Sequence, residues 1–175
     1  MGRWRPPAEK SSPYITPEGA RRLRAELADL WHQQRPEVVR AITAAAAEGD
    51  RSENAEYIYR KKQLREMDRR IQYLSRRVEQ FKVVNDTPRD TQTVRFGAWV
   101  EVRDDDDQAS RWRIVGADEI TTDGRCISVD SPVARALIGK SVGDEVEVER
   151  PAGPISLYIE SVSYRPPDNW PGEQP

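Results

Sequence analysis

The sequence contains very few of the residues that hold a protein together covalently or through a metal. Its 175 residues include one cysteine, Cys126, and one histidine, His32. A single cysteine excludes an internal disulfide, and one residue of each kind excludes a clustered Cys/His zinc site. We therefore expect Cys126 to be a core residue and His32 an ordinary polar helix residue.

Long apolar runs are missing as well. No segment approaches the roughly 20 apolar residues that a membrane-spanning helix needs. The first ten residues hold Arg3, Trp4, Pro6 and Pro7 where a signal peptide would have an apolar stretch. We therefore expect a cytoplasmic protein with no membrane partner. With 37% hydrophobic residues, the chain can bury a modest core in one or two small domains.

The net charge of −2 conceals a strong asymmetry along the chain. Residues 51–82 contain ten basic and five acidic side chains, a net charge of +5. Residues 93–165 contain nine basic and fourteen acidic side chains, a net charge of −5. This division predicts two surfaces that face different partners, one of them a nucleic acid or an acidic channel.

Two helices are predicted in the first half. Thr16 and Pro17 suit a helix start, and a largely apolar face follows at Leu23, Leu27, Leu30, Gln34, Val38, Ile42 and Ala45. Pro36 predicts a kink or a change of packing phase near residues 35–37, because proline lacks the N–H of a helical hydrogen bond. The second helix, over 53–82, has a heptad seam of Tyr57, Leu64, Met67, Ile71, Leu74, Val78 and Phe81, which only Arg60 interrupts.

The short connection at 48–52 predicts that these helices fold back as an antiparallel hairpin, with a second helix roughly 45 Å long. After Pro88 the pattern changes to short alternating strands with one short capped helix near 131–139. The predicted class is α+β: a coiled-coil hairpin, then a small antiparallel β-rich domain. We divide the chain into a flexible tail (1–13), the hairpin (14–86), a linker (87–92), the β domain (93–165) and a second flexible tail (166–175).

The predicted tip of the hairpin, residues 49–56, gathers oxygen-bearing side chains, among them Asp50, Ser52 and Glu53. Asp50 and Glu53 have the spacing of a capping box, which is the reading that the residues alone favour. The alternative is a site for a hard cation, but two carboxylates are too few to hold Mg²⁺ tightly without a partner's ligands. Asp104 to Asp107 is most simply a hairpin loop, with a cation site as the alternative.

Basic residues follow the second helix, and at steps of three, four and seven they share one side of it. A solvated flank would explain them, but the excess of cations over anions suits contact with phosphates. The candidate RNA-binding residues are Arg60, Lys61, Lys62, Arg65, Arg69, Arg70 and Arg76.

Several stretches resemble the bacterial Gre transcript-cleavage factors, GreB more closely than GreA. The tip, Gly49-Asp50-Arg51-Ser52-Glu53-Asn54-Ala55-Glu56-Tyr57, is similar to the family's tip motif. Leu30-Trp31 and the basic stretch from Lys61 to Arg70 resemble GreB. In the second domain Phe96-Gly97-Ala98-Trp99-Val100, Arg113-Ile114-Val115-Gly116 and the stretch from Ser131 to Leu137 are also similar. The resemblance covers residues 14–164 and leaves out only the tails.

The resemblance implies a monomeric accessory factor, not an enzyme. The coiled coil would enter the secondary channel of RNA polymerase, and an FKBP-like domain would dock at its rim. Asp50 and Glu53, supported by Ser52, would help to hold a Mg²⁺ ion in the polymerase active site for cleavage of backtracked nascent RNA, whose 3′ end the basic flank would guide. The alternatives are a channel-binding regulator that does not stimulate cleavage and a free-standing coiled coil that binds nucleic acid.

Overall fold

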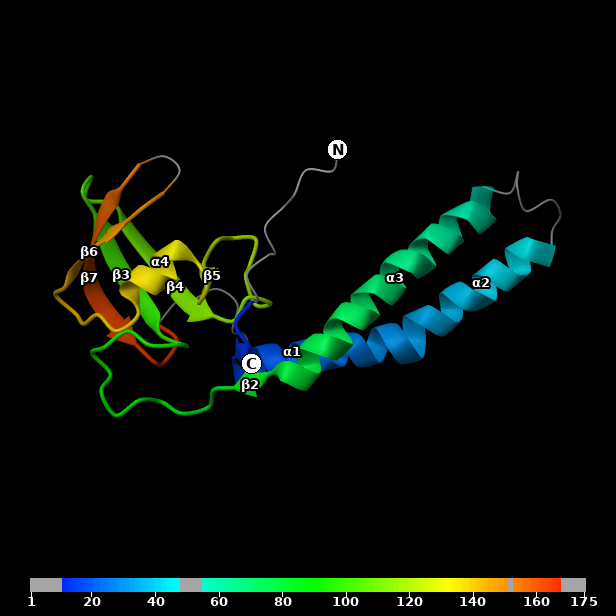
Figure 1. Ribbon diagram of the computed structural model, residues 1–175, viewed down its shortest axis with the longest axis horizontal. Coiled ribbons are helices and arrows are strands. Elements are labelled where there is room, and N and C mark those ends of the chain that lie inside the picture. Colours follow the sequence, from blue (N-terminus) through cyan, green and yellow to red (C-terminus); the bar gives the residue numbers. More distant parts are fainter. Residues whose placement is uncertain (1–10, 48–54, 151–152, 168–175) are drawn as a thin grey trace, which may run out of the picture. The chain divides into compact units, whose positions relative to one another are not determined.

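The computed structural model describes residues 11–47, 55–150 and 153–167 (Figure 1). The described chain is α+β, as predicted, with long helices first and a β-rich part after them. It divides into two compact units: Glu18–Phe81 form the helical hairpin unit, and the described residues on either side form the β unit.

The hairpin unit contains α1 (Pro17–Asp29), η1 (Leu30–Gln34), α2 (Arg35–Ala47) and α3 (Ala55–Gln80). Figure 1 shows α2 and α3 side by side along their length, which confirms the antiparallel hairpin. The predicted heptad seam of α3 is its buried stripe: Met67, Ile71 and Leu74 are buried, and Leu64 and Val78 are half-buried.

The irregularity predicted at Pro36 takes the form of a π-helix. Within η1 the N–H of Arg35 donates to the carbonyl of Leu30, one residue further back than in an α-helix. Pro36 cannot donate to the carbonyl of His32, so the wider turn lies where a helical bond is lost anyway. The change of phase corrects one expectation: Gln34, predicted to face α3, is exposed, and the half-buried Arg35 bonds Asp68 of α3 instead.

The β unit is built on a five-stranded sheet in the order β5-β4-β3-β7-β6. Its strands are β3 (Trp99–Asp104), β4 (Ala109–Val115), β5 (Cys126–Ser128), β6 (Glu145–Val148) and β7 (Ile155–Ser163). All neighbours are antiparallel except β4 and β5, which are parallel, so the predicted all-antiparallel arrangement is wrong for that pair. The predicted loop at Asp104 to Asp107 connects β3 to β4.

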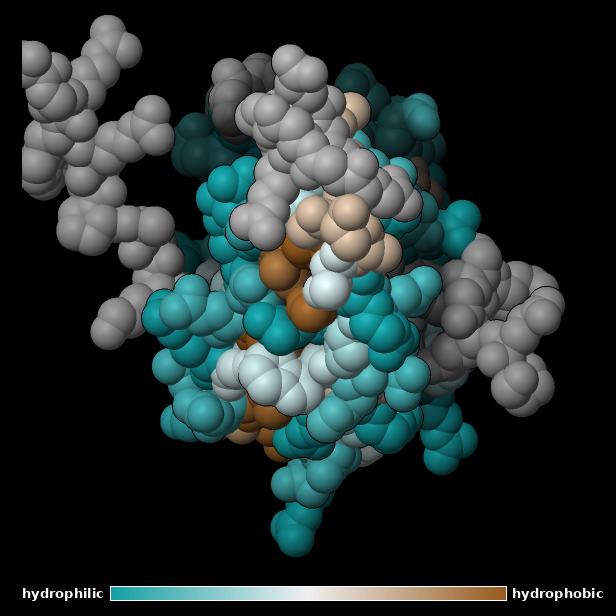
Figure 2. Space-filling model, turned by 90° about the vertical axis from the view of Figure 1, so that its right-hand side faces the viewer, coloured by the Kyte–Doolittle hydropathy of each residue, from teal (hydrophilic) through white to brown (hydrophobic). Residues whose placement is uncertain are grey.

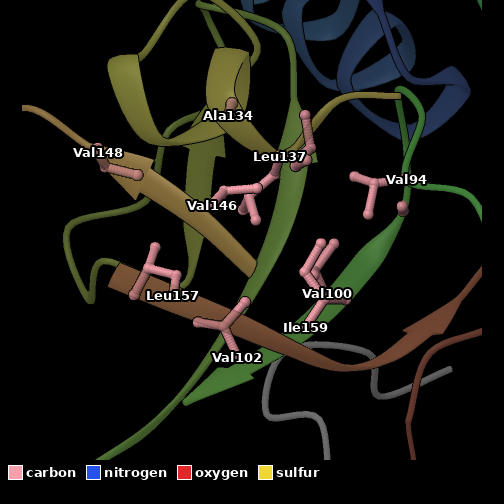
Figure 3. Packing of buried hydrophobic residues seen from close by; sticks show 11 residues of the cluster. Val94, Val100, Val102, Ala134, Leu137, Val146, Val148, Leu157 and Ile159 are labelled. Carbon is pink, nitrogen blue, oxygen red and sulfur yellow. The ribbon is translucent and has the colours of Figure 1, made fainter. Parts of the chain in front are cut away.

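One face of this sheet carries the core. Figure 3 shows side chains from β3, β6, β7 and α4 (Pro132–Leu137) converging, among them Val102, Ile159 and Leu137, which are fully buried. The side chain of Ser131 caps α4 by accepting from the N–H of Ala134 at 3.2 Å. The short capped helix predicted from the sequence is therefore confirmed, and it closes the core over the sheet.

The segment before α1 belongs to the β unit. β1 (Tyr14–Ile15) pairs in parallel with β2 (Lys82–Val83). Glu119, only 5% exposed, accepts from the N–H groups of Thr16 at 3.0 Å and Gly116 at 2.9 Å, and from the Thr16 hydroxyl. A side chain at Gly116 would collide with the carbonyl of Tyr14, since a Cβ there would lie 2.3 Å from that oxygen. The chain thus starts and ends the hairpin from neighbouring strands of the β unit.

These contacts give the hairpin unit different boundaries from those predicted from the sequence. The sequence places residues 14–17 and 82–86 in the hairpin, whereas the compact hairpin unit starts at Glu18 and ends at Phe81. The reason is a pairing between segments about 68 positions apart, which local periodicity does not report.

Candidate nucleic-acid interface on the hairpin

The three candidate residues of the predicted acidic tip lie outside the described residues. Asp50, Ser52 and Glu53 fall between the end of α2 at Ala47 and the start of α3 at Ala55. Their roles therefore stay a prediction. Figure 2, which looks onto this end of the hairpin, shows a narrow hydrophobic strip bordered by hydrophilic residues.

The structure separates the seven candidate RNA-binding residues into two groups. Arg65, Arg69 and Arg76 are exposed, and none of them forms an ion pair with another described residue. They stand at steps of four and seven on α3, which places them along one side of the helix. These three guanidinium groups have no anionic partners in the described chain, and each can donate hydrogen bonds to a phosphate.

The other candidates have partners within the hairpin. Arg70 makes a two-pronged contact with Glu26 of α1, at 2.7 and 2.9 Å. Arg60 lies 3.1 Å from Glu56, and Lys62 lies 3.9 Å from Glu66, each one turn away on α3. Lys61 lies 5.9 Å from the centre of the Tyr57 ring. The exposed pairs at one-turn spacing are weak, whereas the bidentate Arg70 contact joins two helices and is best explained as structural.

A second feature of the hairpin is the side chain of Trp31, to which the sequence assigned no role in a site. Its indole is 53% exposed, and the guanidinium of Arg35 lies 5.7 Å from the ring centre. Trp31 borders two shallow grooves. One, of about 450 Å³, is mainly apolar and runs along α1 past Leu27. The other, of about 550 Å³, runs along α3 past Arg69 and Arg76.

The sequence feature that could have indicated Trp31 is an aromatic residue directly after Leu30, which belongs to the apolar face of the first helix. That position puts it at the edge of the seam rather than in it, because consecutive helical residues are about 100° apart. The sequence could not predict that Trp31 lines the same groove as Arg69 and Arg76. No local pattern gives the register between helical residues about 40 positions apart. Arg77 was likewise missed: it is 9% exposed and stacks 5.7 Å from the Phe81 ring.

The charges of the β unit are arranged differently. The carboxylate of Asp104 accepts from the N–H groups of Asp106 and Gln108, and that of Asp105 accepts from the N–H of Ser156, so this acidic loop is ordered by its own carboxylates. In the described part of the chain no group of three or more His, Cys, Asp or Glu side chains has the geometry to hold a metal ion. Burial raises the pKa of the half-buried Cys126 thiol.

Comparison with known proteins agrees with this two-part architecture. Residues 13–83 match the family model described as "Transcription elongation factor, N-terminal", and residues 89–164 match "Transcription elongation factor, GreA/GreB, C-term". The chain belongs to the GreA/GreB family of transcription elongation factors.

Relatives named "Transcription elongation factor GreB" are similar over nearly the whole chain. The one from Xanthomonas axonopodis pv. citri is 58% identical, over 94% of this chain and 98% of its own. The one from Pseudomonas aeruginosa is 53% identical, over 95% of this chain and 99% of its own. A solved GreA/GreB structure from Nitrosomonas europaea is 20% identical, with a TM-score of 0.41, over 89% of this chain and 100% of that one.

Across residues 11–47, 55–150 and 153–167, no helix combines the length and the apolarity needed to cross a bilayer.

Proposed function

We propose that this GreA/GreB-family chain binds RNA polymerase in the cytoplasm and stimulates the polymerase's own cleavage of backtracked RNA. The hairpin would enter the secondary channel, and the β unit would dock outside it. The chain is then a monomeric accessory factor and not an enzyme. The observation that carries the proposal is the near full-length similarity to GreB factors, which spans both units.

The chemistry is assigned to Asp50, Glu53 and Ser52. Their carboxylate and hydroxyl oxygens are the hard donors that Mg²⁺ prefers, but they are a partial set for an ion that takes six oxygens. The donor set therefore fits an ion shared with the polymerase and not one held by this chain alone. When bound, Mg²⁺ activates water and stabilises the leaving oxygen in phosphodiester hydrolysis. Asp50 and Glu53 would supply negative charge for that ion, and Ser52 would support the tip.

The basic flank of α3 is assigned to the RNA. Arg65, Arg69 and Arg76 are exposed and lack ionic partners among the described residues, so their guanidinium groups are available to the anions of a bound partner. RNA extruded past the tip would present phosphates along this side. Arg60, Lys61 and Lys62 would add charge close to the tip, and Arg70 would act mainly by holding Glu26.

A cleavage assay tests the proposed function. Elongation complexes are halted so that the RNA is backtracked, and cleavage is timed with and without the purified chain. We expect a large increase in cleavage rate that requires Mg²⁺. Tight binding without faster cleavage would instead identify a channel-binding regulator, and binding to free RNA without polymerase would identify a nucleic-acid-binding coiled coil.

A further inference from the structure

Trp31 and the arginines across the groove form a surface that the proposed tip chemistry does not use. The groove of about 550 Å³ is lined by Trp31, Arg35, Asp68, Arg69, Arg76 and Glu79, among others. Arg35 is bonded to Asp68 at 2.9 Å, so this pair is internally neutral. Arg69 and Arg76 then face a single further carboxylate, that of Glu79, and the groove keeps a net positive charge.

The indole of Trp31 leaves a large apolar area exposed on a polar helix pair. Burying an aromatic ring removes a large apolar area from water, and Trp31 leaves about half of its surface outside the protein. Trp31 does not face the interior of the hairpin, whereas the preceding residue, Leu30, is buried. The guanidinium of Arg35 lies 5.7 Å from the ring centre and is bonded to Asp68, so one neighbour of the ring is held in place.

An exposed aromatic ring in the same groove as guanidinium groups without ionic partners is a combination that proteins use to bind single-stranded nucleic acid. Bases stack on the ring whatever their identity, and the cations track the backbone phosphates. A protein partner would suit the apolar half of the surface but would need carboxylates placed at both Arg69 and Arg76, whereas one strand of RNA supplies rings and phosphates together. Charge complementarity therefore favours a polyanion with exposed rings.

We propose that Trp31 is a stacking platform for a base of single-stranded RNA, with Arg69 and Arg76 holding the adjacent phosphates. The inference rests on the proposed function, in which the RNA passes the tip and runs along α3. It goes further by assigning a base contact to a residue outside the basic flank and far from the tip.

The position of Trp31 sets a length requirement. The ring lies 16 residues before the end of α2 at Ala47, which is roughly 24 Å at about 1.5 Å per residue. Stacked nucleotides of one strand advance about 3.4 Å each, so roughly seven nucleotides must pass the tip before a base reaches Trp31. RNA backtracked by two or three nucleotides cannot make the contact.

The test compares cleavage of complexes backtracked by three and by ten nucleotides. The Trp31→Leu variant is expected to lower the ratio of long-substrate to short-substrate cleavage by about tenfold, the typical loss for one stacked base. Trp31→Phe keeps a stacking ring and should restore most of the ratio. Tyr73→Leu is the matched control, because Tyr73 is an exposed ring on α3 that does not line either groove. Thermal unfolding of each variant checks the fold.

A second readout is direct. RNA backtracked by ten nucleotides, with a photoreactive uridine at the eighth nucleotide past the tip, should crosslink to a peptide containing Trp31. The crosslink should be lost in Trp31→Leu. An unchanged ratio for Trp31→Leu, or an equal loss on both substrates together with weaker polymerase binding, would overturn the inference and leave the proposed function standing. Failure of the wild-type chain to stimulate cleavage of either substrate would overturn the proposed function itself.

Discussion

The two units of this protein use charged residues in opposite ways. In the β unit charges serve the fold: Arg103 donates to Glu160 at 2.7 Å, Arg111 to Glu101 at 2.9 Å, and Glu119 is buried among N–H donors. In the hairpin Arg65, Arg69 and Arg76 are exposed without ionic partners in the described chain. A charge left unpaired on a rigid helix is available to a partner, whereas a charge bonded within the fold is not.

Burial differs in the same way. The β unit has a three-dimensional core that includes Val102, Ile114 and Ile159, with exposures near zero. The hairpin buries one stripe along each helix, represented on α3 by Ile71 and Leu74. Most side chains of α3 can therefore be changed without disturbing packing, because they contribute nothing to the stripe. Substitutions of exposed α3 residues should therefore change function without changing stability. Substitution of the buried Glu119 in the β unit should lower stability.

The largest expected effect is at the tip. Asp50→Asn and Glu53→Gln each keep side-chain volume and remove one charge, and each should lower stimulated cleavage by about a hundredfold, as for loss of one charge-stabilising group at a reacting centre. The double variant should be little worse, since groups that act together are not additive. Polymerase binding, measured by competition with labelled wild-type protein, should stay nearly unchanged.

Glu149→Gln in the β unit is the control for this pair, because it removes an exposed carboxylate outside the tip. Normal cleavage by both tip variants, with their fold intact, would mean that Asp50 and Glu53 only cap α3. The comparison between the units would then hold for the basic residues alone.

The next effect concerns stability of the β unit. Glu119→Ala leaves the N–H groups of Thr16 and Gly116 buried without an acceptor, which should cost about 2 kcal/mol. For a unit of this size the Tm should fall by roughly 8–16 °C in calorimetry. Glu119→Gln should cost less, because its amide oxygen can accept from both N–H groups while its NH₂ donates to the Thr16 hydroxyl. Equal losses in the two variants would show that the negative charge of Glu119, which both variants remove, matters more than the hydrogen bonds that Gln can keep.

A smaller effect is expected on the basic flank. Replacing Arg69 and Arg76 together by Gln should lower cleavage of long extruded RNA about fivefold more than cleavage of short RNA, because only long RNA reaches them. The affinity of the protein for complexes with long extruded RNA should also depend less on salt. The slope of log affinity against log salt concentration should become shallower by about 1.4, the value for two single-strand phosphate contacts.

Arg70→Gln is the matched control for the basic flank, since Arg70 is bonded to Glu26 instead of exposed to a partner. It should lower hairpin stability slightly and leave the long-to-short ratio unchanged. If Arg70→Gln alters the ratio as strongly as the double variant does, the division between bonded and available arginines is wrong.

The smallest effect is on the turn that leads into the β unit. Hydrogen bonds from the hydroxyl of Thr93 and the N–H of Gln92 lower the pKa of Asp90 below its ordinary value of 3.8. A carboxylate with a depressed pKa in the folded state stabilises the fold above its unfolded pKa, and the contribution disappears as pH falls through the folded pKa. The protection of the Gln92 amide against exchange, corrected for the intrinsic exchange rate at each pH, should therefore fall only as pH drops below that ordinary value. Asp90→Asn should remove this pH dependence and change Tm very little, because the group is exposed.

Much of the architecture followed from local pattern. The heptad seam of α3 predicted which residues are buried, because a period of 3.5 keeps them on one side of a helix. Alternation after Pro88 predicted short strands in the second half of the chain, where the structure places β3 to β7. The tip motif and basic stretch led to the GreA/GreB family, which the comparisons confirm. The roles of Asp50 and Glu53 remain predictions from that motif.

Other features were decided only by tertiary structure. The pairing of β1 with β2 and the bonds of Glu119 to Thr16 join segments tens of residues apart. The π-helical turn changed the phase of the first helix, so that Arg35 rather than Gln34 meets α3. Trp31 lies beside Arg69 and Arg76 because of the resulting register between helices. Periodicity shows which side of an element is apolar, but packing sets which residues of two elements meet.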